Sequence, residues 1–149
     1  MARQRIENWC AYQERCQQDV RNKLYEYGLH ESEVEEIITE LIGNNFLNEE
    51  RFAIAFAGGK FRIKKWGKIK IKMELRAKKV SDYCINKALQ QIPDNDYLST
   101  LEKIVSKKME QTKEPNRIKK QYKLIQYASS RGFEKDLIVD VLKEIENES

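Results

Sequence analysis

The chain has 149 residues, of which 35% are charged and 40% hydrophobic, and its formal net charge is +4. Six glycines and two prolines are too few for a loop-rich all-β fold, and no run of 18 apolar residues predicts a membrane span. Three cysteines without metal-ligand spacing, and an N-terminus without an apolar stretch, predict a cytoplasmic protein with free thiols and no signal peptide.

The charge is distributed unevenly along the chain. Residues 1–50 hold 5 Lys or Arg and 11 Asp or Glu, residues 51–80 hold 11 and 1, and residues 81–149 hold 12 and 12. The middle block therefore carries +10 within 30 residues. Because lysine runs on solvated helices normally alternate with glutamate, this block favours a surface that attracts phosphate or an acidic protein.

The first unit is expected over residues 1–46. Its leading helix is predicted to carry Trp9, Tyr12 and Cys16 on an apolar face. The second helix is followed by Gly28, which suits the left-handed conformation that closes a helix, and a third helix follows this corner.

The second unit is expected over residues 47–93. Asn48, followed by two glutamates, is a typical helix start, and this helix is predicted to run to about Lys65 before Gly67 breaks it. The corner equivalent to Gly28 is occupied by Lys79, so it must close without a glycine. Ser81 is placed to cap the next helix.

The third unit is expected over residues 94–149. Acidic residues at 94 and 96 begin a helix with apolar residues at helical spacing, namely Leu98, Leu101, Val105 and Met109. Pro115 is predicted in the first turn of the next helix, and Gly132 marks the corner after it.

One apolar register recurs in all three units. Counted from its first member, each set has apolar residues at +5, +10, +13, +14 and +17, and the sets lie 51 and 53 residues apart. The members are Leu24, Leu29, Val34, Ile37, Ile38 and Leu41; Leu75, Val80, Ile85, Ala88, Leu89 and Ile92; and Ala128, Phe133, Ile138, Val141, Leu142 and Ile145. The sequence therefore predicts an all-α fold of three tandem three-helix repeats in an elongated arrangement.

The stretch "KFRIKKWGKIKIK" at residues 60–72 carries seven positive charges and no acid. Its strand-like alternation covers only four residues, which is too short to outweigh the shared helical register, so we expect an interhelical corner and not a β-hairpin. Trp66 in this corner is open to two interpretations, a core residue or an exposed ring among lysines.

Catalytic and cofactor motifs are missing. His30 is the single histidine, which leaves no triad and no Cys/His zinc cluster, and Gly58-Gly59-Lys60 lacks the spacing of a phosphate loop. We therefore predict a protein that is not an enzyme and uses no cofactor or metal.

Three segments, "FLNEERFAIAF", "KKWGKIKIKMELRAKKV" and "SRGFEKDLIVDVL", occur in the order found in the RecX family, bacterial modulators of the RecA recombinase. The chain resembles this family over about residues 15–145. It departs where the family commonly has aspartate, near Asn48 and Glu49, and where Lys68 replaces a common proline. The family's three tandem three-helix repeats agree with the register described above.

The resemblance implies a negative regulator that binds in the groove of the RecA–DNA filament and suppresses its growth, ATP hydrolysis and strand exchange. The expected partners are RecA and DNA, with no membrane, and the chain is expected to be a monomer. The alternative is a helical module that binds DNA or RNA directly through a basic face. For either partner the predicted contact residues are Lys60, Arg62, Lys64, Lys65, Lys68, Lys70, Lys72 and Arg76.

Overall fold

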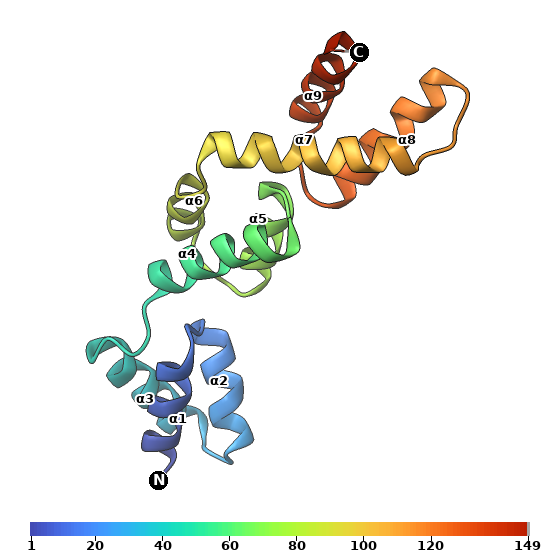
Figure 1. The fold of residues 1–149 in the computed structure, drawn as a ribbon. Coiled ribbons are helices and arrows are strands. Elements are labelled where there is room, and N and C mark those ends of the chain that lie inside the picture. Colours follow the sequence, from blue (N-terminus) through green and yellow to red (C-terminus); the bar gives the residue numbers. More distant parts are fainter. Residues whose placement is uncertain (149) are drawn as a thin grey trace. The chain divides into compact units, whose positions relative to one another are not determined.

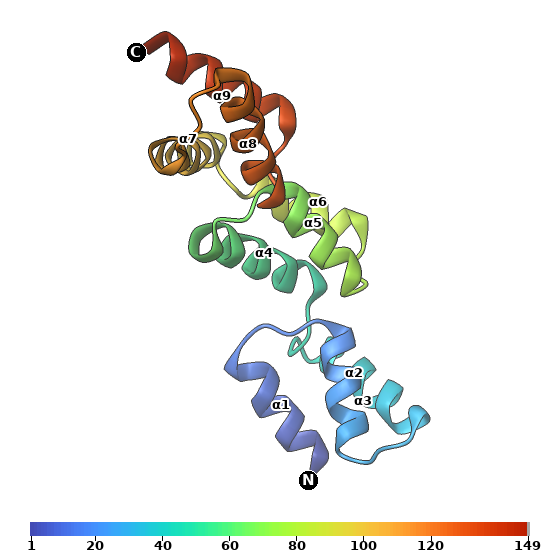
Figure 2. The same cartoon turned by 90° about the vertical axis from the view of Figure 1, so that its right-hand side faces the viewer.

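The computed structural model describes residues 1–148, which form α-helices and one π-helix without any strand. In chain order these are α1 (Ala2–Tyr12), α2 (Gln17–Glu26), α3 (Glu31–Gly43), α4 (Glu49–Gly59), the π-helix η1 (Lys60–Lys64), α5 (Lys68–Ala77), α6 (Asp82–Gln90), α7 (Asp94–Gln111), α8 (Arg117–Ser130) and α9 (Lys135–Glu148) (Figures 1 and 2). The all-α prediction is confirmed.

The chain forms two compact units, each made of two separate segments. Unit 1 contains residues 1–56 and 74–89, and unit 2 contains residues 57–73 and those from 90 onward. Helices α4 and α5 each begin in one unit and end in the other. The repeat boundaries expected from the sequence, 1–46, 47–93 and 94–149, stay a prediction.

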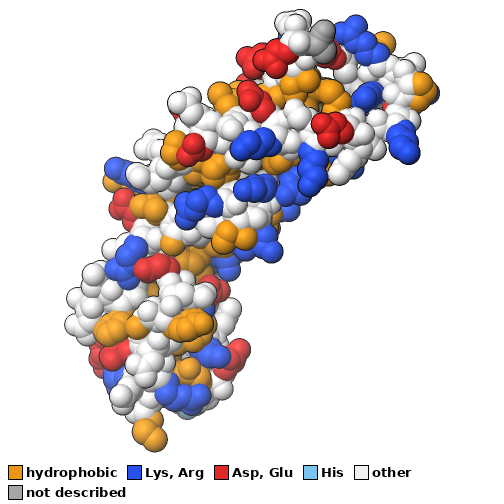
Figure 3. Space-filling model, in the orientation of Figure 1, with side chains coloured by type: hydrophobic (Ala, Val, Ile, Leu, Met, Phe, Trp, Pro, Cys, Tyr) orange, Lys and Arg blue, Asp and Glu red, His pale blue; other side chains and the backbone are white. Residues whose placement is uncertain are grey.

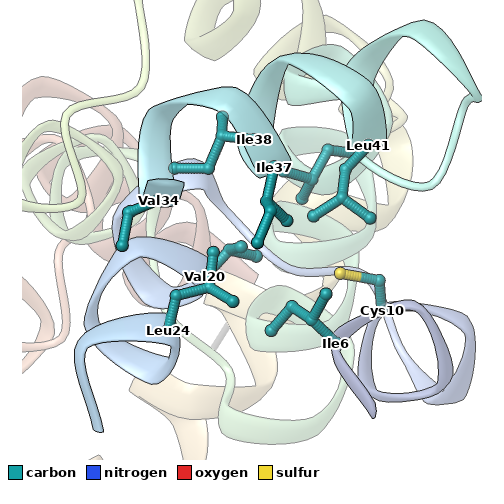
Figure 4. Packing of buried hydrophobic residues seen from close by; sticks show 9 residues of the cluster. Ile6, Cys10, Val20, Leu24, Val34, Ile37, Ile38 and Leu41 are labelled. Carbon is teal, nitrogen blue, oxygen red and sulfur yellow. The ribbon is translucent and has the colours of Figure 1, made fainter. Parts of the chain in front are cut away.

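The core of unit 1 lies between α1, α2 and α3 (Figure 4). The buried side chains come from all three helices and the segment after α3: Ile6, Cys10, Val20, Leu24, Val34, Ile37, Ile38, Leu41 and Leu47. Each fully buried aliphatic side chain contributes about 1.5–3 kcal/mol relative to an exposed one. The spacing of Val34, Ile37, Ile38 and Leu41 explains why α3 turns a single apolar face to this core.

The leading helix of unit 1 differs from its prediction. Ile6 and Cys10 form the buried face of α1, while Trp9 is half-buried. The placement of Tyr12 in the apolar face was wrong, because this residue ends the helix and is 83% exposed. Cys16 is buried but lies at the start of α2, where its sulfur accepts a hydrogen bond from the Asp19 amide at 3.4 Å.

The core of unit 2 is formed mainly by α7, α8 and α9, which pack against one another pairwise. Leu101 and Val105 of α7 are buried, as predicted from their spacing. Leu98 and Met109 are not: Leu98 is 38% exposed and Met109 is half-buried. The apolar face of α7 is completed instead by Tyr97, which is 3% exposed and lies one turn before Leu101.

The repeated register is confirmed. Fifteen of its eighteen members are buried, and Leu29, Leu89 and Ile145 are half-buried. The register thus marks the same buried positions in three successive helix–corner–helix segments.

The backbone at the three corners explains the first offset of the register. Gly28, Lys79 and Gly132 all have positive φ, at 86°, 62° and 96°. The amide of the next residue then donates to the carbonyl five positions back: Leu29 to Leu24 (3.4 Å), Val80 to Leu75 (3.1 Å) and Phe133 to Ala128 (3.3 Å). This is the Schellman ending, which brings the two apolar side chains of each pair together. Lys79 therefore adopts the conformation that glycine adopts at the other two corners.

Three of the predicted helix starts are confirmed and one is wrong. Helix α7 begins at Asp94, as expected. The Asn48 Oδ1 accepts from the Arg51 amide at 2.8 Å, and the Ser81 Oγ accepts from the Cys84 amide at 3.3 Å. Pro115 does not lie in the first turn of α8, because Asn116 caps this helix through its Oδ1, which accepts from the Lys119 amide at 3.0 Å. The asparagine side chain satisfies an amide of the first turn, so the helix starts after Asn116 and the proline lies outside it.

Candidate functional site

The candidate site is the basic corner, which we define as residues 60–72 with seven cations and no acid. It consists of η1, a three-residue connection and the beginning of α5, all within unit 2. The chain is helical on both sides, so the prediction of an interhelical corner is confirmed. Figure 3 shows Lys and Arg side chains gathered over η1 and α5.

The first side of the corner is a widened helix. After Gly59 the α-helical pattern changes to the π-helix η1, which ends at Lys65 in the left-handed conformation with φ 59°. The absence of a side chain at Gly58 leaves room for the Arg62 guanidinium, whose Nη1 lies 2.7 Å from the position of an ideal Cβ on Gly58. Gly58 and Gly59 thus lie where the geometry of this helix changes.

Trp66 combines the two roles that the sequence left open. Its ring is half-buried, and the ammonium groups of Lys60 and Lys70 lie 5.0 and 4.7 Å from the ring centroid. Cations at this distance from an indole are attracted by its quadrupole, at about 0.5–1 kcal/mol for an exposed pair. Trp66 therefore packs at the corner and also orients two of its lysines.

Two glycines hold the corner against the end of α8. The Gly67 amide donates to the Arg131 carbonyl at 2.7 Å, and the Ile69 amide donates to the Gly132 carbonyl at 3.0 Å. A Cβ on Gly67 would lie only 2.2 Å from the Gly132 carbonyl carbon, so the contact requires glycine at this position. The corner is consequently fixed by backbone contacts and not only by its own side chains.

Tyr97 strengthens this attachment from inside unit 2. Its hydroxyl accepts from the Lys68 amide at 2.9 Å and donates to the Glu134 carboxylate. Its ring packs between Phe61 and Phe133, with centroid distances of 5.8 and 5.1 Å. Burial of the phenol, reinforced by its hydrogen bond to Glu134, raises the pKa of Tyr97, so the hydroxyl stays protonated and able to donate.

The eight predicted contact residues are placed in different environments. Arg62, Lys64 and Lys65 are exposed, while Lys60, Lys68, Lys70 and Lys72 are half-buried. The Lys68 ammonium lies 4.0 Å from the Asp94 carboxylate and 4.8 Å from the Tyr97 ring centroid. Arg76 belongs to unit 1, where its guanidinium pairs with Asp82 at 3.2 Å. Seven of the eight residues are therefore brought together in one unit.

Neither a metal-ligand cluster nor a membrane-spanning helix is found in the described part of the chain. Among residues 1–148, no group of His, Cys, Asp and Glu side chains is arranged to hold a metal ion. In the same range, no helix is both long and apolar enough to cross a bilayer.

Fold and surface together define an all-helical repeat protein whose cationic corner is hydrogen-bonded through its backbone to the end of α8. Family models agree with this class: residues 48–89 match the second three-helix domain of RecX, and residues 94–142 match the third. The chain belongs to the RecX family.

Curated relatives carry the name regulatory protein RecX. The one from Clostridium acetobutylicum is 31% identical over 137 residues, which is 89% of this chain and 63% of that protein. One from Bacillus cereus is 21% identical over 141 residues, 95% of this chain and 52% of that protein. The chain thus spans between about half and two-thirds of these relatives' length.

Solved structures support the fold. The crystal structure of RecX from Lactobacillus salivarius superposes with a TM-score of 0.87 at 24% identity, covering 97% of this chain and 94% of that one. A second crystal structure of a regulatory protein RecX gives a TM-score of 0.84 at 23% identity, with coverages of 93% and 70%.

Proposed function

We propose that this chain is a negative regulator of the RecA recombinase. In this proposal it binds the RecA–DNA filament and suppresses filament growth, ATP hydrolysis and strand exchange. Membership of the RecX family and the curated relatives' name, regulatory protein, support a regulatory role. The observation that carries the proposal is the basic corner, which gathers seven cations without an acid and is fixed to the end of α8 by the Gly67–Gly132 contact.

A nucleoprotein filament offers two kinds of anion, carboxylates of the recombinase and phosphates of the DNA. A dense cationic surface raises the association rate with either, and this effect weakens as salt screens it. A rigid corner also loses little conformational entropy on binding, which leaves more of the interaction energy for affinity.

The second candidate is direct binding of DNA or RNA through the same corner. Phosphate contacts require only Lys and Arg side chains that share a surface, and the exposed Arg62, Lys64 and Lys65 are candidates for them. The two candidates differ in one measurement. Filament binding requires much tighter association with recombinase-coated DNA than with bare DNA, whereas equal affinities would favour the second candidate.

The test of filament regulation is a double variant, Lys64→Glu with Lys72→Glu. Lys64 is exposed, Lys72 is half-buried, and neither is ion-paired within residues 1–148. The matched control is Lys135→Glu with Lys143→Glu, which makes the same charge change at two exposed positions of α9. Both proteins are titrated into an assay of ATP hydrolysis by the cognate recombinase on single-stranded DNA.

The corner variant should need at least about tenfold more protein for half-inhibition, equivalent to about 1.4 kcal/mol. The control should inhibit like the parent. A corner variant with unchanged helical content that inhibits as well as the parent would show that the corner is only a solvated face.

A further inference from the structure

A second basic surface lies in unit 2 outside the predicted residues. It is a hollow of about 560 Å³ between α7 and the end of α8, and we call it the basic groove. Five cations line it: Lys65, Lys103, Lys107, Lys108 and Arg131. Ile104 and Tyr127 contribute apolar surface between them. The sequence did not reveal it, because residues 81–149 carry equal numbers of acids and bases.

The groove is cationic without compensation. No acidic side chain is among its lining residues, and within residues 1–148 none of its five cations forms an ion pair. An adjoining hollow of about 230 Å³ shares Lys65 and Lys103, extends to Arg62, and contains one acid, Asp96. The positive surface therefore continues from the basic corner along α7.

Two of the five cations lie against the Tyr127 ring before any ligand binds. The Lys108 ammonium lies 4.6 Å from the centroid of the Tyr127 ring, and the Arg131 guanidinium carbon lies 5.9 Å from it. Arg131 also donates through Nη2 to the Lys64 carbonyl at 2.7 Å, which ties the groove to the corner. Such preorganisation lowers the entropy cost of binding an anion.

The spacing along α7 suits a chain of phosphates. Lys103 and Lys107 are four residues apart, so their side chains share a face with Cβ atoms about 5–6 Å apart. The α7 residues in the lining run from Thr100 to Gln111, a length of about 16 Å at 1.5 Å per residue. Phosphates of one strand repeat at about 3.4 Å along a B-form axis and lie farther apart in an extended single strand, so this length covers more than one of them.

The chemistry of the lining distinguishes nucleic acid from an acidic peptide. The cationic side chains only donate hydrogen bonds, and the neutral side chains that can accept are limited to Thr100, Gln111 and the Tyr127 hydroxyl. A peptide brings backbone N–H donors that need acceptors, whereas every phosphate of a nucleic-acid strand brings acceptors. The apolar surface of Ile104 and Tyr127 suits the base faces that an unpaired strand exposes.

We propose that the basic groove binds the backbone of single-stranded nucleic acid. This inference goes beyond the proposed function, because it assigns a different set of residues and requires no recombinase. Lys103 and Lys107 contact successive phosphates, and Lys108 and Arg131, held by Tyr127, contact the same strand at the other wall.

The experiment measures the salt dependence of binding to a fluorescent oligothymidylate of about 15 nucleotides, a length in the range of known single-strand sites. The probe is followed by anisotropy between about 50 and 200 mM salt. The test variant is Lys103→Gln with Lys107→Gln, and the matched control is Lys135→Gln with Lys143→Gln. All four positions are exposed and lie in unit 2. Circular dichroism verifies that each variant keeps the helical content of the parent.

Loss of two phosphate contacts should lower the slope of log affinity against log salt by about 1.4, because each contact to a single strand contributes about 0.7. The control should keep the parent's slope. Equal slopes for parent and test variant would overturn the proposal, as would failure of the parent to bind at the lowest salt. Equal affinity for a duplex of the same length would refute single-strand binding. Stronger displacement by polyglutamate than by unlabelled oligothymidylate would assign the groove to an acidic protein.

These outcomes are separable from those of the proposed function. The binding assay contains no recombinase, and the Lys64→Glu, Lys72→Glu variant retains all five cations of the groove. Filament regulation can therefore fail while the groove still binds single strands, and the reverse can also occur.

Discussion

Replacing Gly67 by alanine should detach the basic corner from the end of α8. The added Cβ would lie 2.2 Å from the Gly132 carbonyl carbon and 2.3 Å from the Phe133 amide nitrogen. Both neighbours are backbone atoms, so no side-chain rotation relieves the overlap. The two segments must separate, and the hydrogen bonds from the Gly67 amide to Arg131 and from the Ile69 amide to Gly132 are then lost.

The expected loss is about 3–5 kcal/mol of unfolding free energy. Two hydrogen bonds contribute about 1 kcal/mol each, and inserting a methyl group into close-packed structure costs about 1–3 kcal/mol. For a chain of this size the melting temperature should fall by roughly 6–20 °C, at about 2–4 °C per kcal/mol. This is a large effect for one methyl group.

Thermal denaturation, with hydrogen exchange at the Ile69 amide, measures the effect and its location. The matched control is Gly59→Ala, because no atom lies within 4 Å of a Cβ there and alanine is a better helix former than glycine. The control should be as stable as the parent or up to about 1 kcal/mol more stable. If Gly67→Ala melts with the control and keeps the protection of the Ile69 amide, the close glycine contact does not fix the corner.

Lys79→Gly should raise the unfolding free energy by about 0.5–1 kcal/mol in urea denaturation, because the lysine has φ 62° and glycine adopts this conformation without strain; a loss of stability would contradict the reasoning. Tyr97→Phe should cost about 1–3 kcal/mol, since the Lys68 amide and the Glu134 carboxylate both lose the hydroxyl, and an unchanged urea midpoint would show that solvent replaces it. Burial raises the pKa of the Cys10 and Cys16 thiols from 9.0 to about 11. Because the thiols lose their protons more readily in the unfolded chain, the unfolding free energy should fall as pH rises from about 9 to about 11. Cys10→Ala should flatten that decline, and an equal slope in both proteins would exclude this thiol as a cause.

The sequence predicted the repeats because their signal is local. Leu75 and Val80, or Ala128 and Phe133, are five residues apart and meet through one Schellman ending, so the same offset recurs wherever the same corner forms. Helix starts at Asn48 and Ser81 were also predictable, since a cap depends on the residues within one turn of it. The prediction that Pro115 lies in the first turn of α8 was wrong, because the next residue, Asn116, is also a typical helix start and its Oδ1 accepts from the Lys119 amide.

The candidate site was only partly predictable because its arrangement depends on contacts distant in sequence. The charge block identified the corner, but the attachment of Gly67 to Gly132 joins residues 65 positions apart. For the buried face of α7, Leu98 was predicted instead of Tyr97. The four-residue spacing between Tyr97 and Leu101 could have identified the tyrosine as a member of that face. The positive surface around Lys103 and Lys107 could not be predicted, because acidic residues lie near them in the sequence. None of these acids is among the residues that line the groove.

The interleaving of the two units has a consequence for the chain as it leaves the ribosome. Unit 1 has all its residues once position 89 has been synthesised, but residues 57–73 must then await 60 further residues before unit 2 is complete. At about 5–20 residues per second this interval lasts roughly 3–12 s. In the first part of that time, until position 132 has been synthesised, the corner lacks Gly132, whose carbonyl later accepts from the Ile69 amide. A chain truncated after position 89 and released from the ribosome should therefore carry the seven cations on a loose segment whose two ends both join unit 1.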